Sequence, residues 1–404
     1  MTQPRRGRRR RTVAIATAAS LSVLLSPLLA TPATADPTPP TAAVPVIDTA
    51  AFADPPSAVR PMFRWWMPLA YTEDSVLREQ LDQIAASGAG GVEVAPFIVA
   101  GEGNQSNAFL AEYGWGTPAW AHKMEVITEK AAELGLIVDQ NLGPHYPPTV
   151  PTLNSFNQPE AEQQLVFGWS AHAAGEAVTG ALPSPLTAPP SVATKLAEGA
   201  TAGQTALTVA SLGGFAIGDV VTLGAEGTSE TVTVTAVGDR LGATGMLTVT
   251  PISGDHAVDA PLVNVAETTR LRTVIAQCEA ECAPGSEGPA ALVPGSIVDV
   301  TDKVVDGQLD YTFPADGARW VIIDFQQTAS GLVGQRGGYT ATQPNYVVDH
   351  LGRGGVDIQA DFWDENILTD AVKANLDKVG GGAIFEDSLE LGESQKWTWS
   401  FLDQ

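Results

Sequence analysis

The sequence is poor in cysteine and in basic residues. Its 404 residues include two cysteines, and 22 lysines and arginines stand against 46 aspartates and glutamates, a formal net charge of −24. This acidic excess argues against nucleic acid as a partner, because phosphate backbones are bound by clustered basic side chains. Cys278 and Cys282 lie four apart in a polar segment without a nearby histidine. That spacing favours a local disulfide over a zinc site.

Long apolar runs are missing after the first 35 residues. Six arginines between Arg5 and Arg11 precede the apolar run Val13–Ala30, and Ala33-Thr34-Ala35 follows. This order is typical of a signal peptide cleaved after Ala35. A retained anchor is the alternative, but the run barely reaches the roughly 18 residues of a spanning helix. We therefore expect a secreted, extracellular protein with no membrane segment after signal cleavage.

Common catalytic and cofactor motifs are also missing. The sequence contains no G-x-S-x-G, no H-E-x-x-H and no G-x-x-x-x-G-K motif. The glycine-rich pieces at 352–355 and 380–382 lack the strand-to-helix setting of a nucleotide site. We therefore expect no nucleotide or flavin cofactor.

The composition changes along the chain, which is long enough for two or three domains. After the signal peptide at 1–35, residues 36–60 predict a flexible leader rich in Pro, Thr and Ala. Short apolar runs alternate with amphipathic helices in 61–150. Residues 151–335 predict a β-rich, sandwich-like insertion that includes a small β module at 192–265. The α/β pattern returns in 336–404.

Strands are expected at 62–67, 91–95, 136–138 and 383–385, with helices between them. Strands that alternate with helices predict right-handed βαβ units and a parallel sheet, either an α/β barrel or a doubly wound sheet. Four such strands are half of the eight that a closed barrel needs. We therefore expect an α/β fold that stops before a barrel is complete, or one that a partner completes.

Acidic and aromatic residues gather where the expected parallel strands end, which is where α/β barrels place their active sites. Sugar sites use this mixture, because carboxylates supply acid, base and hydroxyl contacts while aromatic rings stack on pyranoses. By strand alternation, one of Trp65 and Trp66 is expected in the core. His145 has the alternative of an exposed loop residue. The candidates are Trp65, Trp66, Glu93, Asp139, Asn141, His145, Glu386, Asp387 and Glu390.

Several blocks in one order resemble glycoside hydrolase family 106, the α-L-rhamnosidases. The early blocks are Arg64-Trp65-Trp66-Met67-Pro68, Gly90-Gly91-Val92-Glu93, Tyr113-Gly114-Trp115-Gly116-Thr117-Pro118 and Asn141-Leu142-Gly143-Pro144. The later ones include Val348-Asp349-His350-Leu351 and Glu386-Asp387-Ser388-Leu389-Glu390-Leu391-Gly392. The resemblance covers most of 60–404 apart from the module.

The resemblance implies a partial (β/α)8 TIM-type barrel interrupted by β-sandwich segments. It also implies inverting hydrolysis of terminal α-L-rhamnosyl linkages in rhamnose-containing oligo- or polysaccharides, often with calcium. The general acid falls on Glu390, and the base is expected from a later strand, beyond residue 404; the metal ligands stay unassigned. The implied substrate contacts are Trp65, Trp66, Glu93, Asn141, His145, Asp349, His350 and Asp387.

Two positions depart from the family pattern. Gly352-Arg353-Gly354-Gly355 is poor helix material where the family continues a helix. Leu389 stands where an aromatic residue is expected. A non-catalytic carbohydrate-binding protein, or an inactive fragment, is therefore the alternative to a glycosidase.

Overall fold

The computed structural model describes residues 48–97, 106–239, 244–279, 288–289, 291–334, 344–379, 382–392, 394–399 and 401. The expected signal peptide and residues 36–47 of the expected leader lie outside these ranges. Contacts divide the chain into a unit of residues 1–52 and a unit of residues 53–404, with α1 (Thr49–Ala53) at the division. No helix in the described ranges is long and apolar enough to cross a membrane.

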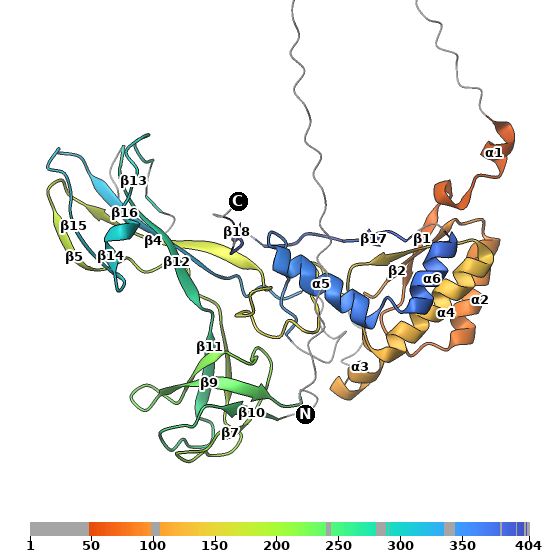
Figure 1. Cartoon of the computed structure of the whole chain (residues 1–404), viewed down its shortest axis with the longest axis horizontal. Helices are drawn as coiled ribbons and strands as arrows, with labels where there is room; N and C mark the ends of the chain where they lie inside the picture. The colour runs from red at the N-terminus through yellow and green to blue at the C-terminus, as the bar shows by residue number, and fades with distance from the viewer. Residues whose placement is uncertain are drawn as a thin grey trace, which may run out of the picture. The chain divides into compact units, whose positions relative to one another are not determined.

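Four parallel strands form one sheet of the second unit (Figure 1). Its order follows the sequence, and its members are β1 (Met62–Trp66), β2 (Gly91–Ala95), β3 (Ile137–Asn141) and β17 (Ile384–Phe385). The register aligns Arg64 with Glu93 and Glu93 with Asp139. β17 joins the edge of β3 although residues 142–383 separate the two strands.

Helices cover one face of this sheet. They are α2 (Asp74–Ala86), α3 (Asn107–Tyr113), α4 (Pro118–Leu134), α5 (Arg353–Asn366) and α6 (Asp370–Val379). α4 contacts both α2 and α6, and the three lie together beside the strands in Figure 1. Val92, Val94 and Val138 are at most 2% exposed and belong to the core that these helices share with the sheet.

Local signals in the sequence explain where these helices begin and end. The Thr117 side chain accepts a hydrogen bond from Trp120 N, and Pro118 takes the first helical position of α4. Gly135 ends α4 in the left-handed conformation, with φ 68°. The N-cap of α2 is Glu73, not the Thr72 hydroxyl that the sequence also offers, and Glu73 makes no side-chain cap hydrogen bond.

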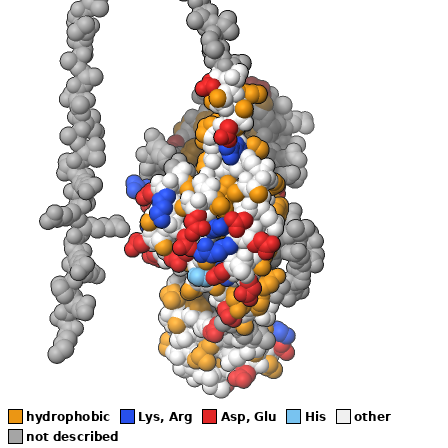
Figure 2. Space-filling view, turned by 90° about the vertical axis from the view of Figure 1, so that its right-hand side faces the viewer, with side chains coloured by type: hydrophobic (Ala, Val, Ile, Leu, Met, Phe, Trp, Pro, Cys, Tyr) orange, Lys and Arg blue, Asp and Glu red, His pale blue; other side chains and the backbone are white. Residues whose placement is uncertain are grey.

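Figure 2 shows acidic and basic side chains interleaved on the side of the molecule that carries α2 and α4. Lys123 Nζ lies 2.5 Å from Asp74 Oδ1, and Arg78 pairs with Glu129. Exposed pairs of this kind contribute only about 0–1 kcal/mol each. They indicate that this face of the helices is solvated.

The β-rich region contains two further antiparallel sheets. The larger has the order β13-β12-β16-β4-β18 and the smaller the order β14-β15-β5. One core draws on both sheets through Ile275, Leu309 and Trp320. The strands are β4 (Gln163–His172), β5 (Ala177–Ala181), β12 (Thr268–Gln277), β13 (Val298–Asp299), β14 (Val304–Val305), β15 (Gln308–Thr312), β16 (Trp320–Ala329) and β18 (Gln395–Trp397). Cys278, just after β12, is disulfide-bonded; the only other cysteine, Cys282, lies outside the described residues.

The module forms a separate six-stranded sheet in the order β6-β11-β8-β9-β10-β7. Ala197 N donates to Thr208 O at 2.8 Å and Ala210 N to Lys195 O at 2.9 Å, so β7 also pairs with the end of β6 and the sheet closes on itself. Each of the six described strands therefore has a neighbour on both sides. The strands are β6 (Ser191–Lys195), β7 (Ala206–Val209), β8 (Val220–Leu223), β9 (Glu230–Val237), β10 (Gly245–Val249) and β11 (Pro261–Val265).

The structure is therefore a mixed α/β protein with many strands and few helices. A closed (β/α)8 barrel is not shown, because the parallel sheet of the described residues has four strands. The interpretation of Gly352–Gly355 as poor helix material is wrong. α5 begins at Arg353 and includes Gly354 and Gly355.

Candidate functional site

Polar and aromatic side chains occupy the face of the parallel sheet that the helices leave open. Successive side chains of a strand point to opposite faces. Since Val92, Val94 and Val138 face the helices, Glu93 and Asp139 face away from them, and the register adds Arg64 to the same row. One step further along the strands, Trp66, Asn141 and Phe385 lie on this open face.

Arg64 is the centre of this open-face group. Its Nη2 lies 3.0 Å from Glu93 Oε1 and its Nη1 lies 2.9 Å from Asp387 Oδ2. The guanidinium carbon is 4.9 Å from the centroid of the Phe385 ring, which is within cation–π range. Asn141 Nδ2 is 3.5 Å from Glu93 Oε1, a weak contact. Three predicted site residues, Glu93, Asn141 and Asp387, therefore come together around a cation that links two of them.

A line of aromatic rings adjoins this group. The Trp66 ring meets Phe97 edge-on at a centroid distance of 5.9 Å, and Phe97 meets Tyr146 edge-on at 5.5 Å. Phe97 is buried, whereas Trp66 is 47% exposed and offers an indole surface to solvent. An exposed indole beside carboxylates is the combination that sugar sites use.

Two other predicted contacts lie elsewhere. Trp65 faces the helices, packs against the core and donates from Nε1 to Gln80 Oε1 at 2.8 Å. Alternation thus separates it from Trp66. His145 is 2% exposed and its Nδ1 lies 2.7 Å from Thr149 Oγ1. The alternative of an exposed loop histidine is therefore wrong.

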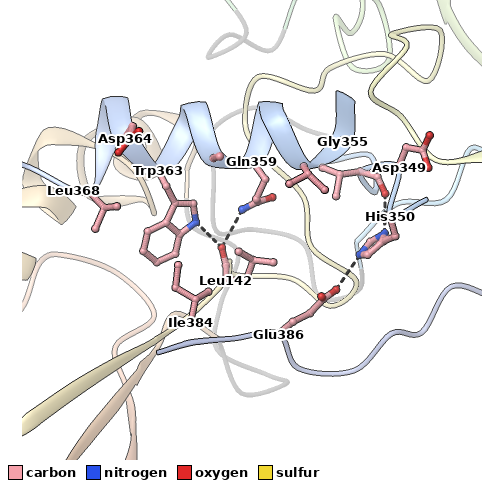
Figure 3. Close-up of a pocket in the computed structure, with 13 residues that line it drawn as sticks. Leu142, Asp349, His350, Gly355, Gln359, Trp363, Asp364, Leu368, Ile384 and Glu386 are labelled. Carbon is pink, nitrogen blue, oxygen red and sulfur yellow. Dashed lines mark hydrogen bonds and ion pairs between the residues drawn. The ribbon is translucent and has the colours of Figure 1, made fainter. Parts of the chain in front are cut away.

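A second group lines a pocket of about 380 Å³ between α5, β17 and the loop before α5 (Figure 3). Most of its lining is apolar: Leu142, Val348, Val356, Ala360, Trp363, Leu368 and Ile384. Trp363 Nε1 and Gln359 Nε2 both donate to Leu142 O, at 2.9 and 3.0 Å. Asp349, His350 and Glu386 supply polar groups at one end of the pocket.

Asp349 and His350 make close contacts with the protein itself. Asp349 is 2% exposed and accepts hydrogen bonds from Leu351 N, Gly352 N and Thr398 Oγ1. Burial raises the pKa of its carboxyl, while these hydrogen bonds act in the opposite direction. His350 Nε2 lies 2.9 Å from Glu386 Oε1.

Glu386 and Asp387 point to different groups because they are neighbours in an extended segment. Glu386 lines the pocket and contacts His350, whereas Asp387 reaches Arg64 on the open face. The predicted acid, Glu390, is exposed and follows them in the stretch between β17 and β18. Leu389, beside it, is 58% exposed.

The acidic residues do not form an evident metal centre. Among the described residues, no group of three or more histidine, cysteine, aspartate or glutamate side chains is placed to hold a metal ion. Calcium is also coordinated by backbone carbonyls, amide oxygens and water, which such a group does not count.

The sequence interpretation missed Arg64, Phe97 and Phe385 as parts of the site. Arg64 carried a usable signal, because a charged residue inside a five-residue apolar strand is rare unless it has partners. No such signal exists in the sequence for Phe97 and Phe385, because an aromatic residue in or just after a strand usually belongs to the core.

Comparisons with known proteins agree with the resemblance in the sequence. The family model for glycoside hydrolase family 106, described as α-L-rhamnosidase, matches residues 53–404. A search of curated proteins found no match. Among solved structures, the chain is similar to a rhamnosidase from Novosphingobium sp. PP1Y at 16% identity and a TM-score of 0.44, covering 88% of this chain and 40% of that one.

A complex of the two major capsid proteins of bacteriophage P23-77 is similar at 15% identity and a TM-score of 0.12, covering 43% of this chain and 83% of that one. The chain spans less than half the length of the rhamnosidase that it matches. The family model, in contrast, begins within the expected leader and covers all residues after it. The chain belongs to glycoside hydrolase family 106, the α-L-rhamnosidases.

Proposed function

We propose that this protein is a secreted glycosidase that removes terminal α-L-rhamnosyl groups from rhamnose-containing oligo- or polysaccharides. One structural observation supports this proposal in addition to family membership. Arg64 is held between Glu93 and Asp387 on the open sheet face, with the exposed Trp66 ring beside it. Carboxylates, a guanidinium and an indole together supply the acceptors, donors and flat apolar surface that a deoxyhexose needs.

The open-face group suits recognition of a neutral sugar. Glu93 and Asp387 are each partly exposed, at 18% and 28% of their side chains, so they keep oxygen lone pairs toward solvent. Sugar hydroxyls donate to these oxygens and accept from Arg64, while the apolar face of the pyranose stacks on Trp66. Asn141 adds an amide that both donates and accepts.

The proposed chemistry is hydrolysis with inversion. Glu390, as the carboxylic acid, protonates the glycosidic oxygen, and the bond to the anomeric carbon breaks through an oxocarbenium-like transition state. A second carboxylate takes a proton from the attacking water on the opposite side of the ring. The two carboxyl groups of inverting enzymes stand about 6.5 to 9.5 Å apart. The second carboxylate is not assigned to a residue of this chain.

The finer architecture belongs to the same proposal. β1, β2, β3 and β17 correspond to four successive strands of a (β/α)8 barrel, whose inner face is the open face described above. The proposed route out of the cell is the N-terminal signal peptide, which lies outside the described residues. Calcium stays an expectation from the family resemblance.

The test is hydrolysis of an aryl α-L-rhamnoside by the wild-type protein, with calcium and then with a chelator. Glu390→Gln should lower kcat by at least ~100-fold, because it removes the transferable proton and keeps the shape. Glu226→Gln, the same change at an exposed turn of the module, is the matched control.

Two results would separate the proposal from its alternative. The proposal that the protein is a glycosidase is supported if the wild type hydrolyses the substrate, Glu390→Gln abolishes the hydrolysis and Glu226→Gln leaves it intact. Binding of L-rhamnose by calorimetry without any hydrolysis would instead favour a non-catalytic carbohydrate-binding protein, since the Arg64 group does not include Glu390.

A further inference from the structure

We propose that Asp349 and His350 are positioning residues that clamp the segment carrying Asp387 and Glu390, and that they do not contact the sugar. The clamp consists of Asp349, His350 and their partners Glu386 and Thr398. It holds the segment 386–398, of which the structure describes 386–392 and 394–398. The inference rests on the proposed role of Glu390 and adds to it how that residue is held.

The Asp349 carboxylate is occupied by protein donors. Oδ1 accepts from Leu351 N at 2.9 Å and from Gly352 N at 3.0 Å, at the start of α5. Oδ2 accepts from Thr398 Oγ1 at 2.7 Å. Both Asp349 and Thr398 are only 2% exposed. A buried carboxylate with three protein donors ties the far end of the segment to a helix N-terminus and has little surface to offer a ligand.

His350 holds the near end of the segment in the same way. Its Nδ1 lies 2.8 Å from Val348 O, an acceptor, so Nδ1 carries the hydrogen of that bond. Its Nε2 lies 2.9 Å from Glu386 Oε1. Both ring nitrogens are thus engaged, and Figure 3 shows the imidazole directed at Glu386.

Gly352, which caps α5, and Gly355, in its first turn, leave the space that this clamp occupies. A Cβ on Gly352 would lie 2.3 Å from Asp349 Oδ2 and 2.5 Å from Thr398 Oγ1. A Cβ on Gly355 would lie 2.2 Å from Asp349 O. The φ of Gly352 is −109°, which any residue can adopt. Glycine is therefore required here by the lack of space for a side chain and not by the backbone conformation. These glycines, unfavourable for a helix, are explained by the close approach of Asp349 and Thr398.

Three further contacts fix the same segment. Asp387 pairs with Arg64 on the open sheet face. Lys396 Nζ lies 2.5 Å from Glu162 Oε1, and β18 pairs with the start of β4. Glu390 therefore lies between anchored residues on both sides, an arrangement that limits where its carboxyl can go.

The experiment compares wild type with His350→Ala and Thr398→Val, which open the two ends of the clamp separately. Hydrogen exchange of the peptide spanning 386–399 should speed up by about tenfold in each variant, with the rest of the protein unchanged. With an aryl α-L-rhamnoside, kcat should fall by roughly tenfold or more while KM changes less than about threefold, because geometry and not sugar binding is lost. Asp357→Asn, at an exposed position of α5, is the control and should change neither quantity.

The opposite pattern would overturn the proposal. If His350→Ala raised KM at least tenfold and left exchange of the segment unchanged, His350 would be a sugar contact. If hydrogen exchange of the segment were unchanged in Thr398→Val, Asp349 would not be part of the clamp. This variant also tests the proposal by itself if His350→Ala fails to fold. A wild-type protein without hydrolytic activity would refute the proposed function, while the exchange measurement would still decide whether the clamp exists.

Discussion

Glu230 is the carboxylate whose removal should most clearly destabilise the six-stranded module. It stands at the start of β9 and accepts hydrogen bonds from Ser253 N at 2.6 Å, Ser253 Oγ at 2.8 Å and Gly254 N at 3.0 Å. His256 Nε2 lies 2.8 Å from its Oε1. Burial alone would raise the pKa of Glu230, but the hydrogen bonds from His256 and from the 253–254 turn outweigh it and lower that pKa from 4.5 to about 2.

The size of the effect follows from this pKa. Each tenfold change in proton affinity between the folded and unfolded states is worth ~1.4 kcal/mol, so the gap between 4.5 and about 2 corresponds to about 3 kcal/mol. Because the folded pKa is the lower one, this stabilisation is fully present above pH 4.5. It is lost as the pH falls toward 2. Glu230→Gln should therefore destabilise the module by about 3 kcal/mol at pH 7, and by progressively less below pH 4.5.

Urea unfolding of the whole protein at pH 7 and at pH 3 measures this difference, and hydrogen exchange of the 230–256 peptides assigns it to the module. Glu226→Gln, in the exposed turn before β9, is the control and should stay within ~0.5 kcal/mol of wild type at both pH values. The reasoning fails if Glu230→Gln costs the same at both pH values. It fails equally if the substitution costs less than ~0.5 kcal/mol at pH 7.

Three substitutions test other contacts. Lys396→Met leaves the Glu162 carboxylate, which is only 4% exposed, without its cation. The free energy of unfolding in urea should fall by about 3–5 kcal/mol. Adding Glu162→Gln to the same chain should restore part of this loss. Trp66→Ala should weaken L-rhamnose binding about fivefold by calorimetry at unchanged Tm, since it removes an exposed stacking surface. Trp65→Phe should do the reverse, lowering Tm and sparing affinity, because Trp65 packs on the helices and bonds Gln80. If the two tryptophan substitutions weakened binding equally, the placement of Trp66 on the open face of the sheet and Trp65 on the helix face would be contradicted.

Periodic segments of the sequence predicted their structure well. Apolar and polar residues alternate at 206–210, 219–223, 230–237 and 246–250, and these segments match β7, β8, β9 and β10 within one residue at each end. Alternation of apolar and polar residues is a local signal, and each of these strands buries one face in the module core. The capped helix α4 was predictable for the same reason, because its start and stop signals lie in the sequence itself.

Contacts between distant parts of the chain were not predictable from local patterns. Alternation alone shows that Trp65 and Trp66 face opposite ways, but which one enters the core depends on where α2 lies. The burial of His145 depends on neighbours far along the chain, since a Cβ on Gly334 would lie 2.6 Å from its Cβ. The helix at Arg353 was missed because propensity counts its glycines as unfavourable, while packing against Asp349 requires them.

The β-rich region is part of the scaffold of the proposed site as well as an insertion between β3 and β17. The segment after β17 begins in the parallel sheet, where Asp387 meets Arg64, and ends in the antiparallel sheet, where β18 pairs with Gln163–Leu165 of β4. β4 is itself held along its full length by β16. The position of Glu390 thus depends on both sheets at once. A substitution that shifts β4 against β16 would move the proposed acid relative to Arg64 without touching any residue that contacts the sugar.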